Sequence, residues 1–159
     1  MGAIPYTEAM QAALEGFHAS GPEHRNCAQT MMAFAAMRLD APLEVCEIAR
    51  YLGGGIARQG LICGVLTGTV LALGLKGSSW VVAGSDRAQA PVADPQADLQ
   101  ALFRDFHTEF GGTDCSVLTG CDLSTPEGLA AFRETRGSNT CTRMLTWTMG
   151  RLELMLNVR

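Results

Sequence analysis

Apolar residues recur at helical spacing along almost the whole chain, and no run of alternating β-branched residues interrupts them. This periodicity is typical of amphipathic helices rather than strands. It predicts an all-α protein, a single-domain helical bundle of about six or seven helices that spans residues 1–159. A chain of 159 residues buries on the order of 70% of its extended surface, so its core needs no disulfide or metal for support.

Capping and helix-breaking residues divide the chain into its expected elements. The stretch near 77–96 is rich in Gly, Ser, Ala, Pro and Asp, which predicts a long surface connection. The sequence Ser124-Thr125-Pro126-Glu127 predicts a capping box at a helix start. Helices are expected over 7–19, 26–39, from 42 to the triple glycine at 53–55, 60–75, 94–110 and from 124, with a short helical turn from 114 and a last helix from 139 or 140 to 157.

Charge and the N-terminal sequence narrow the range of functions. The net charge is -4, the pI is near 5.3, and the basic residues are scattered, so a nucleic-acid partner is not expected. The start of the chain has no basic region followed by an apolar run, which predicts a cytoplasmic protein. The apolar segment 61–75 is shorter than the ~20 residues that span a bilayer, so we expect a buried core helix and no membrane contact.

Small residues follow one face of that apolar segment. Gly60, Gly64, Gly68 and Ala72 stand four residues apart and form a smooth stripe on a helix. Glycine costs about 1 kcal/mol relative to alanine inside a helix, so the stripe must serve packing or chemistry. Small residues let another backbone approach closely. We expect a neighbouring helix, or a cofactor bound at Gly60, Gly64 and Gly68, to lie against this face.

Six cysteines are unusual in a reducing compartment, where they indicate metal ligation or redox chemistry more than permanent cross-links. Cys63 lies within the glycine-rich segment. Three others each follow a common helix-capping residue, in the pairs Asn26-Cys27, Asp114-Cys115 and Thr140-Cys141. A thiol in the first turn of a helix meets unpaired backbone N–H groups, which favour the thiolate. Nearby arginines that could add to this effect are Arg25, Arg58, Arg136 and Arg143.

The remaining two cysteines have weaker signals. Cys46 falls in the apolar face of a predicted helix, which favours simple packing, since free cysteine often acts as a small hydrophobe. Cys121 lies in a loop close to Cys115 and is either a resolving thiol or an incidental surface residue. The chain has no C-x-x-C and no zinc-finger spacing, so a shared site must be assembled from distant helices.

Four segments together resemble a known bacterial family. They are NCAQ at 26–29, GGGIARQGLICGVLTG at 53–68, FGGTDC at 110–115 followed by TGCDLSTPEG, and the late Cys141. The chain resembles the redox-active family named for its C, GCAxxG, C, C pattern. The resemblance implies that the family cysteines are Cys27, Cys63, Cys115 and Cys141, here called the pattern cysteines. Val65 stands where the family favours alanine, and Cys46 and Cys121 are additional.

Three functional interpretations remain open. The first is a thiol–disulfide protein, a thiol-dependent oxidoreductase with an unidentified redox partner, which needs two cysteine Cα atoms within about 7 Å. The second is an iron–sulfur cluster or zinc bound by the pattern cysteines, because thiolates are soft ligands. The third is a non-catalytic helical interaction module, expected to be a homodimer, with cysteines in its core.

Overall fold

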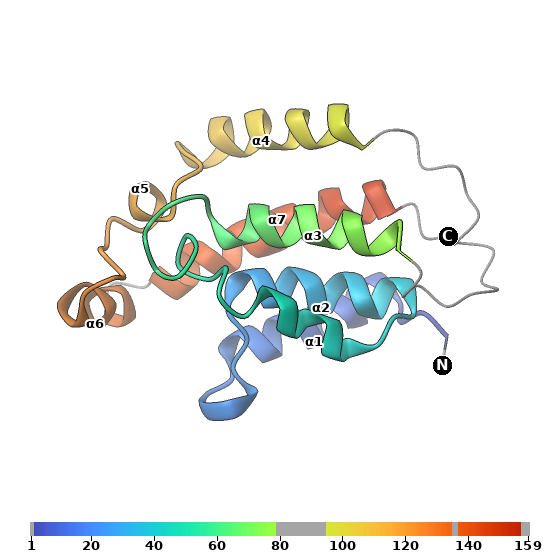
Figure 1. The fold of residues 1–159 in the computed structure, drawn as a ribbon, viewed down its shortest axis with the longest axis horizontal. Helices are drawn as coiled ribbons and strands as arrows, with labels where there is room; N and C mark the ends of the chain where they lie inside the picture. The colour runs from blue at the N-terminus through green and yellow to red at the C-terminus, as the bar shows by residue number, and fades with distance from the viewer. Residues whose placement is uncertain (1, 79–94, 135–136, 157–159) are drawn as a thin grey trace.

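The computed structural model describes residues 2–78, 95–134 and 137–156, and it confirms the all-α prediction (Figure 1). In the described parts of the chain, the only β-pairing is an isolated antiparallel bridge between Ile62 and Asp114. None of the helices in these ranges is long and apolar enough to cross a membrane. The elements are α1 (Tyr6–His18), η1 (Gly21–Glu23), α2 (Cys27–Leu39), η2 (Leu43–Ala49), α3 (Gly64–Lys76), α4 (Gln96–Phe110), α5 (Cys115–Thr119), α6 (Pro126–Glu134) and α7 (Gly137–Leu156).

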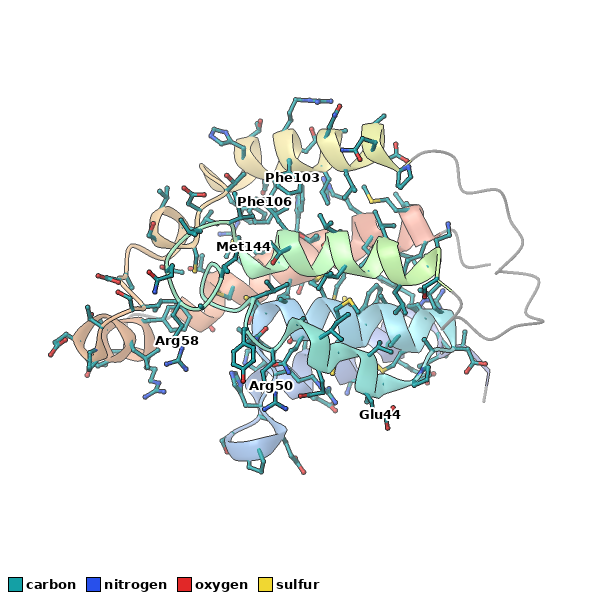
Figure 2. All side chains as sticks on the ribbon, in the orientation of Figure 1. Glu44, Arg50, Arg58, Phe103, Phe106 and Met144 are labelled. Atoms are coloured by element: carbon teal, nitrogen blue, oxygen red, sulfur yellow. The ribbon has the colours of Figure 1, made fainter. Side chains whose placement is uncertain are left out.

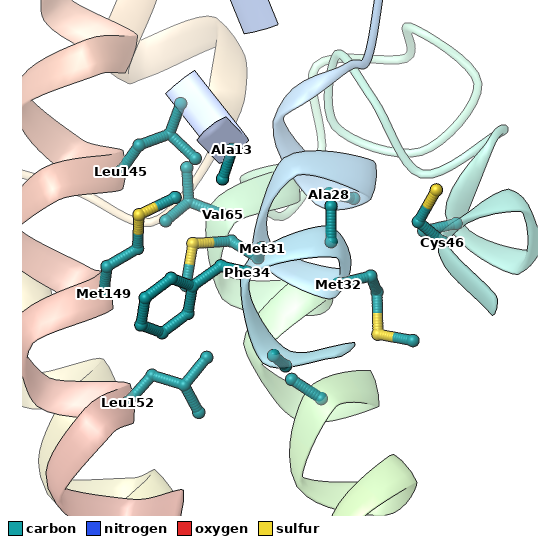
Figure 3. Close-up of a cluster of buried hydrophobic side chains, with 14 of the residues drawn as sticks. Ala13, Ala28, Met31, Met32, Phe34, Cys46, Val65, Leu145, Met149 and Leu152 are labelled. Carbon is teal, nitrogen blue, oxygen red and sulfur yellow. The ribbon is translucent and has the colours of Figure 1, made fainter. Parts of the chain in front are cut away.

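Helix α2 is the centre of the bundle. Its sequence, CAQTMMAFAAMRL, is apolar on nearly every side, so it can be packed all round by α1, α3, η2 and α7. Met31 and Phe34 are fully buried, and Figure 3 shows them on the side of α2 that faces Met149 and Leu152 of α7. The core therefore runs through α2, with the other long helices arranged around it.

A buried ion pair joins the C-terminal half of α2 to α7. Arg38 Nε lies 2.8 Å from Glu153 Oε2, and Arg38 Nη2 lies 2.5 Å from Glu153 Oε1. Arg38 also donates to the carbonyl oxygen of Ile4. The guanidinium is thus paired by two parallel hydrogen bonds, the geometry that best offsets the cost of burying a charge.

Helix α4 covers α7 with an apolar stripe. Leu102 and Phe106 are buried, and Figure 2 shows Phe103 and Phe106 on the side of α4 that faces the bundle. The Phe106 ring lies 4.7 Å from the Phe110 ring and 5.9 Å from the Trp147 ring, measured between centroids. Such aromatic contacts fix α4 on α7.

Helices α2 and α3 approach each other closely, as the small-residue stripe predicts. A β-carbon added at Gly68 would lie 2.7 Å from the carbonyl oxygen of Ala28 and 2.9 Å from its Cα. One added at Gly64 would overlap Cys27 Sγ. A neighbouring helix was one of the two expectations for the face that carries Gly64 and Gly68. It is confirmed, because both glycines face α2.

Gly60 does not belong to this stripe, and the prediction of a helix from residue 60 is wrong. Helix α3 begins at Gly64, whereas Gly60 has a φ of 71° in the preceding turn. A β-carbon added at Gly60 would lie 2.9 Å from Ser116 Cβ, so this glycine faces α5 instead of α2. Positive φ and a close neighbour together account for glycine at this position.

Several other boundaries also differ from expectation. The third helix is a 3-10 helix, η2, and α7 begins at Gly137, before the predicted caps at 139 or 140. Thr125 caps α6, since its Oγ1 accepts from the backbone N–H of Gly128 at 3.0 Å, while the Ser124 hydroxyl donates to Asp122. Of the predicted surface connection, residues 79–94 lie outside the described ranges.

Candidate functional site

Cys27 is the first residue of α2, and its neighbour Asn26 fixes its position. The Asn26 and Gln29 side chains form a reciprocal capping box, with each accepting from the other's backbone N–H. Asn26 Nδ2 also donates to the carbonyl oxygen of Arg50 at 2.7 Å. A β-carbon added at Gly53 would lie 2.7 Å from Asn26 Cβ. The start of α2 is therefore held against the chain that follows η2.

A left-handed turn lies next to this helix start. Gly54 and Gly55 have φ values of 67° and 73°, and Ile56, Ala57 and Arg58 follow with 60°, 51° and 60°. A non-glycine residue in this region costs roughly 1–2 kcal/mol, so the turn must be stabilised by its surroundings. The turn closes on itself, since Gly60 and Leu61 donate backbone hydrogen bonds to Gly54 and Gly55, both at 3.0 Å. Figure 2 shows the Arg58 side chain directed away from the bundle.

The Cys27 sulfur lies where this turn meets two helix N-termini. Burial raises the pKa of the Cys27 thiol. Nearby backbone N–H groups act in the opposite direction, because they favour the thiolate; the largest of these effects comes from Gly54, followed by Ala28, Cys27 and Gly64. These amides favour the thiolate, as the helix start predicts, but the pKa of Cys27 still lies above its ordinary value. Removing the sulfur from water outweighs the local amides, because a charge is costly in an apolar environment.

The bridge between Ile62 and Asp114 brings two further pattern cysteines together. Cys63 N–H donates to the carbonyl oxygen of Thr113 at 2.8 Å, and Cys115 N–H donates to that of Leu61 at 2.7 Å. Successive side chains of an extended segment alternate in direction. Both cysteines flank the bridged pair, so their side chains lie on the same face of this short ladder.

Cys141 occupies a different position from the one predicted. Since α7 begins at Gly137, Cys141 is its fifth residue and does not directly follow a cap. Burial raises the pKa of its thiol, with smaller contributions from the negative charges of Cys27 and Cys115. The pKa of Cys115 is raised as well, to about 11, by burial and then by the charge of Cys27.

The four pattern cysteines lie close enough to affect one another's ionisation. For Cys63, Cys115 and Cys141 alike, burial is the main cause of a raised pKa, and the charge of Cys27 is the next. After burial, the charge of Cys27 is thus the largest influence on the pKa of each of the other three thiols. Over the described parts of the chain, no three Cys, His, Asp or Glu side chains are grouped in a way that could hold a metal ion.

Cys46 belongs to a different part of the molecule. Figure 3 shows it on the far side of α2 from Leu145 and Met149. It is buried, and burial raises the pKa of its thiol while the charge of Arg25 lowers it. Arg25, one of the arginines considered for the pattern cysteines, therefore acts on Cys46.

The other arginines near the cysteines in sequence have separate surroundings. The guanidinium of Arg143 lies 5.9 Å from the centroid of the Phe110 ring, in a cation–π contact with α4. Arg136 lies outside the described residues. Val65, the departure from the family pattern, is fully buried and faces α7, so it does not occupy the contact that Gly64 makes with Cys27.

The sequence analysis did not predict two features of this site, the reciprocal capping box at the start of α2 and the left-handed turn. The Asn26–Gln29 capping box carries a detectable signal, because the N-x-x-Q spacing is that of a reciprocal cap. The left-handed conformation of Ile56, Ala57 and Arg58 has no such signal, since these residue types disfavour it. Only the preceding glycines indicate positive φ values.

A comparison with protein-family models gives a match over residues 25–155, to the family described as "Putative redox-active protein (C_GCAxxG_C_C)". The matched region extends from the residue before Asn26 almost to the end of α7, so it includes all four pattern cysteines. Searches of curated proteins and of solved structures gave no match.

Proposed function

Because the chain belongs to the redox-active C_GCAxxG_C_C family, we propose that it is a thiol–disulfide redox protein whose pattern cysteines store electrons as a reversible disulfide. In one cycle, two thiols lose two electrons and two protons to an oxidant and form one S–S bond. Reduction by a partner dithiol reverses the step. The observation that carries this proposal is geometric: a β-carbon added at Gly64, the residue after Cys63, would overlap Cys27 Sγ, and the backbone bridge between Ile62 and Asp114 sets Cys63 beside Cys115.

The electrostatics of the site support a disulfide. Burial keeps the thiols protonated, since it raises the pKa of every pattern cysteine. A disulfide is neutral, so its formation places no charge in the apolar interior. Thiol exchange needs a transient thiolate, and Cys27 has the backbone amides of Gly54, Ala28 and Gly64 to stabilise one. Cys27 is accordingly the pattern cysteine that attacks in exchange.

The test is a count and a map of thiols in the reduced and oxidised protein. The reduced protein is treated anaerobically with diamide, then denatured, and its free thiols are alkylated and counted. We expect the count to fall from six to four or fewer, with peptide mapping placing the link between pattern cysteines. Cys46→Ser is the matched control, because Cys46 lies apart, and the same link should form in that variant.

Two results would contradict the proposal. One is that all six thiols survive oxidation in the folded protein. The other is visible absorption of an iron–sulfur cluster in anaerobically purified protein, together with thiols that react only after chelation, which would assign the pattern cysteines to a metal.

A further inference from the structure

Exposed apolar side chains gather along one stretch of the surface. They come from the end of η2, from the turn that follows it and from α5. Together they are called the apolar face here, and they are Ile48, Tyr51, Ile56, Leu61 and Val117. Tyr51 and Val117 are the most exposed of them, at 77% and 65%. Grouped exposed apolar side chains indicate an interaction site, because their burial in a complex is favourable.

Short backbone hydrogen bonds join the parts of this face. Ala57 N–H donates to the carbonyl oxygen of Tyr51 at 2.7 Å, so the turn folds back toward the end of η2. Cys115 N–H donates to the carbonyl oxygen of Leu61 at 2.7 Å, which sets the start of α5 beside the end of the turn. Figure 1 shows the turn between η2 and α5, at the end of the bundle where α2 and α3 begin. The apolar face is therefore one connected surface.

This face borders the pattern cysteine that a partner can approach. Cys27 is partly exposed, whereas the other three pattern cysteines are buried. Its neighbour Asn26 donates through Nδ2 to the carbonyl oxygen of Arg50 at 2.7 Å, which holds the start of the turn against α2. A β-carbon added at Gly64 would overlap Cys27 Sγ and would lie 3.1 Å from the carbonyl oxygen of Leu52. A molecule bound to the apolar face therefore lies next to Cys27.

The charge of this surface favours an acidic partner. In the segment 48–63, the charged side chains are those of Arg50 and Arg58. Arg50 is paired with Glu47, whereas Arg58 is exposed, points away from the bundle (Figure 2) and has no ion pair with any residue that the structure describes. Asp114, next to α5, is half-buried. A symmetric dimer through this face would bring Arg58 of both copies together, so carboxylates of a different protein match the charge better than a second copy does.

Resting on the proposed function, we infer that the apolar face docks the redox partner, a protein whose disulfide lies in an apolar surface flanked by carboxylates. The apolar side chains supply the contact area, and Arg58 meets a partner carboxylate at its edge. Tyrosine and arginine are enriched in protein–protein interfaces, which agrees with Tyr51 and Arg58 at this place. Docking then presents the partner's disulfide to Cys27.

The exchange balances in two steps. The Cys27 thiolate attacks one sulfur of the partner's disulfide, so a mixed disulfide forms and one partner thiol leaves. A second pattern thiolate then attacks Cys27 Sγ, which releases the second partner thiol and leaves one S–S bond in this protein. In total, the partner's disulfide gains two electrons and two protons, and two pattern thiols lose them.

The experiment compares three disulfides as oxidants of the reduced protein under anaerobic conditions. Two are peptide dimers, each linked through a cysteine that lies between phenylalanine and leucine; one peptide has glutamates at both ends and the other has lysines. The third is bis(2-hydroxyethyl) disulfide, which is small and uncharged. The rate of disulfide formation between pattern cysteines is followed by mass spectrometry after acid quenching. Each peptide rate is divided by the rate of the same variant with the small disulfide.

The charge prediction concerns the ratio of the glutamate-peptide rate to the lysine-peptide rate. Arg58→Glu should lower this ratio at least about tenfold relative to the wild type at low ionic strength, and high salt should reduce the effect. The matched control is Arg104→Glu on α4, an exposed position where the net charge changes by the same amount. Circular dichroism confirms that each variant is folded.

The apolar prediction concerns both peptides alike. Tyr51→Ser and Val117→Ser should each lower the normalised peptide rates at least about fivefold. Val70→Ser in α3 and Leu154→Ser in α7 are the matched controls, because these side chains are 42% and 79% exposed and lie outside the apolar face. Both controls should keep the wild-type rates.

The outcomes separate this inference from the proposed function. If Arg58→Glu changes the ratio no more than Arg104→Glu does, or if the serine variants of the apolar face match their controls, docking at this face is refuted while the proposed function stands. If none of the three disulfides oxidises the pattern cysteines of the wild type, the proposed function fails and the inference fails with it. A wild-type dimer in sedimentation that Tyr51→Ser dissociates would show a second copy on the apolar face, which would also overturn the inference.

Discussion

Replacing Gly68 by alanine adds one methyl group at the contact between α3 and α2. The new carbon would lie 2.7 Å from the carbonyl oxygen of Ala28, 2.9 Å from Ala28 Cα and 2.9 Å from Met31 Cβ. Two of these atoms are backbone atoms of Ala28, which is fully buried, so a side-chain rotation cannot relieve the overlap. The two helices must move apart instead.

The matched control is Gly74→Ala on the same helix. No heavy atom lies within 4 Å of a β-carbon added at Gly74, and that residue is exposed. Alanine is intrinsically better than glycine in a helix by about 0.5–1 kcal/mol, so Gly74→Ala should raise the free energy of unfolding by that amount. Gly68→Ala should instead lower it by ~1–3 kcal/mol, a typical cost of overpacking a core. The expected difference between the two variants is roughly 1.5–4 kcal/mol.

The measurement is chemical denaturation followed by circular dichroism, with thermal melts as a second readout. For a chain of this size, 1 kcal/mol corresponds to about 2–4 °C in Tm. Gly64 is a less clean position for this test, because an added carbon there would displace the Cys27 sulfur and change the thiols as well. If Gly68→Ala proved as stable as Gly74→Ala, with equal denaturant slopes, the close approach of α2 and α3 would be refuted.

Two further predictions concern charge. The fold raises the pKa of the Cys115 thiol from 9.0 to about 11, so the folded state favours the protonated thiol. The contribution of this thiol to the free energy of unfolding is therefore complete below pH 9 and is lost as the pH rises through about 11. At 1.36 kcal/mol per pKa unit, that contribution is at most about 2.7 kcal/mol. Denaturation midpoints at pH 8 and pH 11 should therefore differ less in Cys115→Ser than in the wild type, and an equal difference would contradict this reasoning. Glu153→Gln removes the carboxylate that accepts two hydrogen bonds from the buried Arg38 guanidinium, which should cost ~3–5 kcal/mol in denaturant melts. Glu47→Gln breaks an exposed pair with Arg50 and should cost less than about 1 kcal/mol, and similar losses in both variants would be the contrary result.

The helices and their closest crossing could be predicted from sequence, because both follow from the spacing of residue types. Apolar periodicity indicates α1, α2 and α4, and the four-residue spacing of Gly64 and Gly68 indicates a close neighbour. These signals are local and need no knowledge of the tertiary structure.

The chemistry of the site could not be predicted in the same way. The pKa of a buried thiol depends on how much water the whole fold removes, so the helix start at Cys27 predicts only the effect of the local amides. The position of Cys141 depended on how far α7 extends before it, and helix boundaries are weakly encoded. The left-handed residues Ile56 to Arg58 adopt a conformation that their own preferences oppose.

Cys27, Cys115 and Cys141 lie in α2, α5 and α7, Cys63 immediately precedes α3, and this order has a consequence for protein synthesis. A ribosome adds about 5–20 residues per second, so Cys141 is made roughly 1–5 s after Cys115. During that interval the three earlier thiols exist without the helix that supplies the fourth. Disulfides formed then would join cysteines before their mature neighbours are present. Oxidation before α7 has been translated would therefore trap incomplete chains with the wrong cross-links.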